Sequence, residues 1–166
     1  MARVVSFSYA HFGLVFLSLI FSYALSACSS NNSSEDQIRQ YVSSAVSAAE
    51  SREALAIRNL ISDKYKDESH RDRRRLVGLA LGYFLRNKNI YIFTQISKIK
   101  FPVPDKASVK LYAAMTGSRV TGAQALLDIR ADLYQFDLML TRDGGDWLLQ
   151  NASWQRASIE DIVGGG

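Results

Sequence analysis

Histidine and cysteine, the residue types that most often hold a metal or act as nucleophiles, are scarce in this chain of 166 residues. It contains two His, His11 and His70, and one Cys, Cys28. No pair of them has the helical spacing of a metal site, and a Ser–His–acid triad would have to use His70. His70 lies in a run of charges, where we expect a solvated loop side chain. The sequence therefore predicts no metal, no cofactor and no catalytic residue of these types.

Carboxylates are the remaining candidates for acid–base chemistry. Asp128, Arg130 and Asp132 alternate along a predicted strand, so their side chains share one face. If that face lined a cavity, the row would form a polar site. The alternative is an ion-paired stripe that faces solvent. Asp137 interrupts an apolar run and would need a donor if it pointed inward. The candidate donors are Lys110, Arg119 and Tyr112.

Aromatic side chains could line a pocket for a small apolar ligand, since concave sheets often hold one. With the polar residues above, the candidate pocket-lining set is Tyr83, Tyr112, Arg130, Asp132, Tyr134, Asp137 and Trp154. The alternative is that the aromatic rings simply fill the core between helices and sheet. A glycine-rich phosphate loop is not present, because the glycines are scattered or form a turn.

The charge of the chain does not argue for nucleic acid. The formal net charge is +4, and the basic segment from Lys64 to Arg75 holds six basic and three acidic residues. A balance this mild is too weak to indicate a polyanion as partner. The segment could instead face anionic lipid heads or acidic polymers of the envelope, or it could be the solvated start of a helix.

The first 27 residues read as an export signal. Arg3 precedes an apolar run over 12–25, which contains serines and is shorter than the roughly 20 apolar residues of a membrane span. The residues Leu25-Ser26-Ala27-Cys28 resemble the bacterial lipobox. This resemblance implies cleavage before Cys28, a diacylglycerol thioether on its sulfur, and acylation of the new amino terminus, with palmitate as a typical acyl group. Ser29 after the Cys resembles the pattern of lipoproteins sent to the outer membrane.

The domain organisation follows from this signal. We expect a lipoprotein signal peptide over 1–27, the lipidated Cys and a flexible tether over 28–33, a folded domain over 34–157, and a disordered tail over 158–166. The domain would then face the periplasm from a lipid anchor in the cell envelope.

Along the folded region, the spacing of apolar residues changes from a helical pattern to a strand pattern. Ser34 begins a capping-box pattern before the apolar spacing of Ile38 to Ala49, Ser51 is the expected cap of a second helix, and Asp72 that of a third. From Ile90 onward the period is two, and four strands joined by short loops are predicted. Apolar residues over 129–141 fall on odd positions at first and on even positions later, which predicts a β-bulge or a strong bend near Leu133–Phe136. The fold class is α+β, with three N-terminal helices on a curved antiparallel sheet of about four strands.

Two stretches resemble the nuclear transport factor two-like superfamily, the cystatin-like cone. The segment Ala54 to Asp67 is similar to that family's second helix running into a charged loop. The segment Asp146 to Trp154 is similar to its last strand, with Trp, an apolar pair, a small residue and Trp. The resemblance implies a cone with a pocket and a homodimer through the outer face of the sheet.

The expected function is that of a lipid-anchored envelope protein which acts as a non-enzymatic binding or interaction module. Its partner would be a small apolar ligand held in the cone or another envelope protein, which the charged segment 63–75 could contact. The alternative implied by the resemblance is an isomerase- or cyclase-type enzyme that uses Asp132 or Asp137 as a base in the cone. Fold analogy alone does not decide between them.

Overall fold

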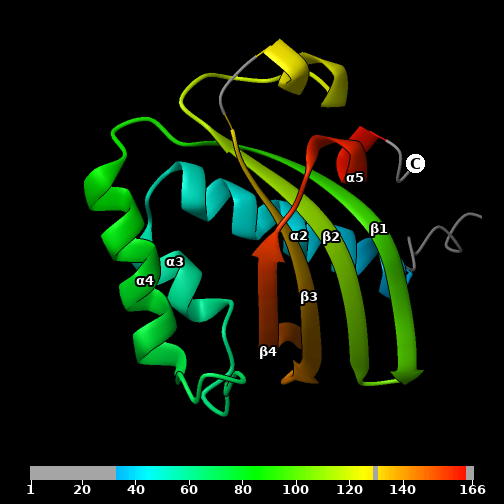
Figure 1. Cartoon of the computed structure of the whole chain (residues 1–166). Coiled ribbons are helices and arrows are strands. Elements are labelled where there is room, and N and C mark those ends of the chain that lie inside the picture. Colours follow the sequence, from blue (N-terminus) through cyan, green and yellow to red (C-terminus); the bar gives the residue numbers. More distant parts are fainter. Residues whose placement is uncertain (1–32, 129–130, 164–166) are drawn as a thin grey trace, which may run out of the picture. The chain divides into compact units, whose positions relative to one another are not determined.

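The computed structural model describes residues 33–128 and 131–163. Within these ranges the longer helices precede the strands, while a 3₁₀ helix lies between two strands and a short helix follows the last one, as Figure 1 shows. The elements in chain order are α2 (Ser34–Glu50), α3 (Ala54–Asn59), α4 (Arg73–Arg86), β1 (Tyr91–Val103), β2 (Lys106–Thr116), a 3₁₀ helix η1 (Ala123–Asp128), β3 (Asp132–Asp143), β4 (Asp146–Arg156) and α5 (Ile159–Val163). The signal and lipid-anchor predictions for residues 1–32 lie outside the described residues. None of the helices in the described ranges is long and apolar enough to cross a membrane.

Side-chain caps fix the starts of the two long helices. Ser33 caps α2 through a capping box with Asp36, one residue before the predicted Ser34. The Asp72 carboxylate accepts from the Arg75 backbone N–H at 2.9 Å, as the sequence predicted for α4. The predicted cap at Ser51 is wrong, because Ser51 ends α2 and α3 begins after Glu53 without a side-chain cap.

The four strands form one antiparallel sheet in the order β1-β2-β3-β4, and Figure 1 shows its strong curvature. The turn between β3 and β4 requires positive φ at both central positions, and glycines occupy them: Gly144 has φ of 59° and Gly145 of 97°. The β2–β3 pairing runs without interruption, so the bulge predicted near Leu133–Phe136 is absent. The β3–β4 pairing shifts instead after Met139.

The concave face of the sheet carries the main core. Residues of α2, including Ile38 and Tyr41, pack with inward residues of the strands such as Val109, Leu140 and Leu149. Figure 1 shows α2 passing behind the strands, with α3 and α4 beside β4. The described residues thus supply a core of their own, within a single compact unit, Ser33–Gly166.

A second, smaller apolar cluster lies on the other face of the sheet. Ala114, Leu126 and Ile162 are buried there, and Tyr112 and Leu133 pack against them. Ile162 belongs to α5, which a reciprocal Ser158–Asp161 contact caps at its start. The prediction of a disordered tail over 158–166 is therefore wrong for Ile159–Val163. The cluster also explains the mixed parity of β3. Leu133 is apolar because it packs in this cluster, so no bulge is needed to turn its side chain toward the main core.

The edge of β4 is covered by the chain that follows α3. Ile61 forms a parallel bridge with Leu149, and the backbone of Leu149 donates to the Leu60 carbonyl at 2.9 Å. The Lys66 N–H then donates to the Gln150 carbonyl at 3.2 Å. These bonds hold the start of the charged segment against the sheet, next to the inward face of β4.

Candidate functional site

A cavity of about 540 Å³ lies between the helices and the concave face of the sheet. Its size is within the range of pockets that hold small organic molecules, roughly 300–1,000 Å³. Most of its wall is aliphatic or aromatic. The residues that line it are Tyr41, Ala45, Ala49, Ile57, Leu60, Ile61, Arg71, Leu76, Leu79, Ala80, Tyr83, Phe84, Arg86, Ile90, Ile92, Met115, Tyr134, Phe136, Leu149 and Trp154.

The structure places the seven candidate pocket residues in different surroundings. Tyr83, Tyr134 and Trp154 line the cavity. Tyr112 does not, because it packs in the cluster on the opposite face. Arg130 lies outside the described residues.

Asp137 also lies on the opposite face, between the inward residues Phe136 and Leu138 of β3. One of its oxygens lies 3.7 Å from the Lys110 ammonium, and the other accepts from the Gln135 amide at 2.9 Å. Lys110 is one of the donors proposed from the sequence. However, the Lys110–Asp137 pair is half-exposed on the convex face of the sheet. Asp137 therefore cannot act on a molecule held in the cavity.

Asp132 borders a second, more polar pocket of about 240 Å³, which shares Tyr83 and Met115 with the first. The Asp132 carboxylate is half-exposed and lies 3.8 Å from the Arg156 guanidinium. Burial raises the pKa of the Tyr83 hydroxyl, and the negative charge of Asp132 raises it further. Tyr83 is therefore a neutral phenol at neutral pH, able to donate and to accept a hydrogen bond.

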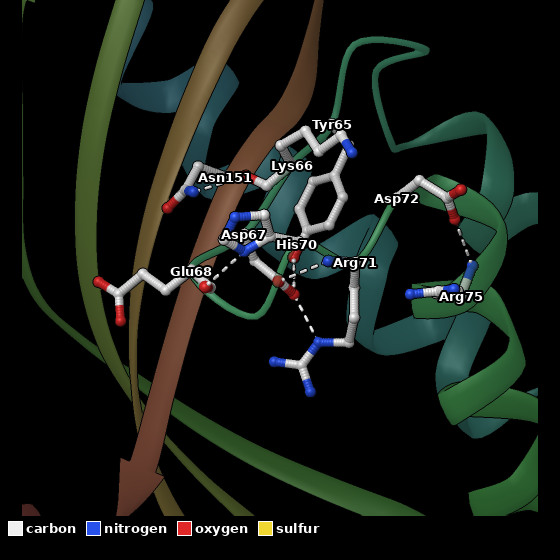
Figure 2. Close-up of polar contacts among 9 residues, drawn as sticks. All are labelled: Tyr65, Lys66, Asp67, Glu68, His70, Arg71, Asp72, Arg75 and Asn151. Atoms are coloured by element: carbon white, nitrogen blue, oxygen red, sulfur yellow. Dashed lines mark hydrogen bonds and ion pairs between the residues drawn. The ribbon is translucent and has the colours of Figure 1, made fainter.

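Asp67 is the centre of the charged segment and is buried, although both interpretations of this segment from the sequence place its charges on the surface. The Asp67 side chain is only 1% exposed. Its carboxylate accepts from the Arg71 Nε at 2.6 Å, the Arg71 backbone N–H at 3.0 Å and the Tyr65 hydroxyl at 3.2 Å, as Figure 2 shows. The backbone closes the same loop, because the Asp67 N–H donates to the Arg71 carbonyl.

Opposing effects act on the pKa of Asp67. Burial raises it, but the hydrogen bonds and the positive charge of Arg71 outweigh burial, so the pKa lies below its ordinary value. Asp67 is consequently ionised at neutral pH and forms a charged pair with Arg71. The pair is tied to the sheet, since the Asn151 amide donates to the Lys66 carbonyl at 2.6 Å.

Arg71 is the functional candidate that the sequence analysis missed. Its guanidinium carbon lies 4.6 Å from the centre of the Trp154 ring, in cation–π contact, and the residue lines the cavity. The available signal was an acidic and a basic residue four positions apart, Asp67 and Arg71, soon after the aromatic Tyr65. It was hidden by the neighbouring basic residues, of which Arg74 and Arg75 are exposed. His70, by contrast, is exposed and its Nδ1 lies 3.1 Å from the Glu68 carbonyl oxygen.

The cavity offers a distinct set of chemical groups. Its charged lining residues are Arg71 and Arg86, and its other polar side chains are tyrosines. Among the described residues that line it, none is a carboxylate, a histidine or a cysteine. Within 33–128 and 131–163, no three His, Cys, Asp or Glu side chains are grouped so that they could hold a metal ion. This arrangement can bind an apolar body and donate hydrogen bonds to a polar end.

Comparison with known proteins gives matches in structure but not in sequence. No family model and no curated protein matches the chain. An uncharacterized protein with a cystatin-like fold from Caulobacter vibrioides superposes with a TM-score of 0.60 at 11% identity, over 78% of this chain and 94% of that one. A hexachlorocyclohexane dehydrochlorinase from Novosphingobium barchaimii gives 0.55 at 12% identity, over 75% and 87%.

A third match is Bd1075 of Bdellovibrio bacteriovorus, with a TM-score of 0.58 at 13% identity over 73% of this chain. The aligned part spans 40% of that protein's length. The proteins that share the architecture thus include an enzyme and a protein without an assigned function. At identities this low the likeness concerns the fold, and it shows that residues 33–163 form an α+β domain of the cystatin-like, nuclear transport factor two-like fold.

Proposed function

We propose that this chain is a lipid-anchored protein of the cell envelope whose domain binds a small, largely apolar molecule in its concave cavity. The observation that carries the binding proposal is the cavity of about 540 Å³ with its mainly apolar wall. The lipid anchor rests on the lipobox-like residues that end in Cys28. An anchored binding domain of this kind would hold its ligand beside the membrane.

Two features favour binding over catalysis. Proton abstraction needs a base within hydrogen-bond reach of the substrate. Neither Asp132, which pairs with Arg156 beside the smaller pocket, nor Asp137, on the convex face, is among the residues that line the large cavity. The titratable groups that do line it are arginines and tyrosines, and burial raises the pKa of the Tyr41 and Tyr83 hydroxyls. Side chains of this kind position a ligand more readily than they remove its protons.

Native mass spectrometry of the gently purified protein tests the proposal. We expect a stoichiometric adduct whose mass identifies the ligand class. The variant Ala45→Phe should abolish the adduct, because Ala45 lines the cavity and a ring there would occupy it, at a cost in stability of about 1–3 kcal/mol.

The matched control is Ser43→Phe, which places the same ring on an exposed position of the same helix. This variant should retain the adduct. The proposal fails if the wild-type protein carries no adduct and takes up no apolar compound, or if both variants bind as the wild type does.

A further inference from the structure

We infer that the molecule bound in the cavity is an amphipathic anion whose carboxylate is held by Arg71. This inference rests on the proposed function, and it names the chemical class of ligand that the same cavity takes. It follows from how the Arg71 guanidinium is fixed, from which of its nitrogen atoms are free, and from the charges around the cavity.

The guanidinium of Arg71 is held on two sides. Its Nε donates to the Asp67 carboxylate at 2.6 Å, and its carbon lies 4.6 Å from the centre of the Trp154 ring. The loop that carries it is itself bound to β4 through Lys66. A charged group fixed in this way loses little side-chain entropy when a ligand binds, which favours affinity.

The remaining donors of Arg71 are unused. Its Nη1 and Nη2 atoms have no hydrogen-bond partner within 33–128 and 131–163. Figure 2 shows both atoms extending away from Asp67. Two adjacent N–H groups on one planar guanidinium match the two oxygens of a carboxylate.

Among the described residues, the charged side chains on the cavity wall itself have one sign. The charged residues that line it are Arg71 and Arg86, and the carboxylate nearest to Arg71, that of Asp67, bonds to its Nε and is not among the lining residues. An anion bound at Nη1 and Nη2 would therefore meet no carboxylate among the described residues of the wall. A cationic ligand would have no opposite charge on the cavity wall described here.

The rest of the wall determines the body of the ligand. Apart from these groups it consists of aliphatic and aromatic side chains such as Leu76, Phe136 and Ile92. A molecule with an apolar body and one terminal carboxylate satisfies both parts of the site. A small hydrophilic anion would leave most of the apolar wall uncovered and gain little from burial.

The test compares decanoate with decanol, which have the same apolar chain and differ in the charged end. Binding to the full chain is measured by Trp fluorescence or calorimetry at neutral pH. We expect decanoate to bind about tenfold to 100-fold more tightly than decanol, as hydrogen bonds to charged groups allow.

The variant Asp67→Asn/Arg71→Gln removes both charges of the pair together and so avoids leaving Asp67 buried and unpaired. It should abolish the preference for decanoate while decanol still binds. Arg71→Lys keeps the charge but loses the paired donors, and should retain part of the preference. Arg74→Gln on the exposed side of α4 removes one cation outside the cavity, and should leave the preference unchanged.

Equal affinity for the two compounds, or a preference that survives in the double variant, would overturn this inference and leave the proposed apolar binding intact. Failure of both compounds to bind, together with an adduct-free wild-type protein, would overturn the proposed function as well.

Discussion

At the scale of single residues, one buried carboxylate organises the charged segment. Asp67 binds a tyrosine hydroxyl, a backbone N–H and a guanidinium at once, and so converts a run of charges into a fixed loop. Removing the carboxylate charge would leave Arg71 without its partner. The loop geometry, and with it the position of Arg71 over Trp154, therefore depends on the ionised state of Asp67.

The variant Asp67→Asn tests this dependence through pH. The pKa of Asp67 is lowered by Arg71, so its contribution to the free energy of unfolding is present above the unfolded-state pKa of about 3.9 and is lost as the pH falls through the folded-state value. We expect the variant to be less stable by about 2 kcal/mol at pH 7 in urea unfolding. The difference in the free energy of unfolding between wild type and variant should become smaller below about pH 4.

The control for this prediction is Asp63→Asn. Asp63 also pairs with an arginine, Arg73, but its side chain is 81% exposed. An exposed pair contributes about 0–1 kcal/mol, so little change is expected at either pH. A difference between wild type and Asp67→Asn that stays constant from pH 7 to pH 3 would contradict the assigned role of the ionised carboxylate.

The secondary-structure elements explain which parts of the fold could be read from the sequence. Helix and strand periods, the Asp72 cap and the glycine turn are local signals, and they agree with the structure. The prediction of a bulge in β3 is wrong because the spacing of apolar residues does not show that a sheet is covered on both faces. The prediction that Tyr112 lines the cavity is wrong for the same reason, because the sequence does not show that η1 and α5 build an apolar cluster on the other face.

Helix α5 is the element whose contribution to the stability of the domain can be measured most directly. Ile162 is 1% exposed and packs with Ala114 and Leu126 on the convex side of the sheet. The variant Ile162→Ala removes a buried side chain, and should lower the free energy of unfolding by about 2–4 kcal/mol in urea titration. Glu160→Gln, on an exposed position of the same helix, should lower the free energy of unfolding far less, because it leaves no cavity in the core. If α5 does not pack in solution, the two variants will unfold at the same urea concentration.

At the scale of the whole molecule, binding and anchoring are assigned to different parts of the chain. The described residues that line the cavity lie between Tyr41 and Trp154 in the sequence. The predicted lipid attachment is at Cys28, the only thiol of the chain. Loss of the anchor should therefore change where the protein is found without changing what it binds.

The variant Cys28→Ser separates the two properties, because serine has no thiol to carry the diacylglycerol thioether. Produced in a bacterium with two membranes, the wild-type protein should gain the mass of its acyl groups and sediment with membranes after a high-salt wash. Several acyl chains make such anchoring stable, whereas one chain binds only marginally. Cys28→Ser should lack the added mass and leave the membrane fraction, while its domain carries the same adduct in native mass spectrometry. A Cys28→Ser protein that stays with the membranes after the wash would show that the N-terminal segment anchors the chain by another means. A released protein that has lost its adduct would show that the cavity is loaded only at the membrane.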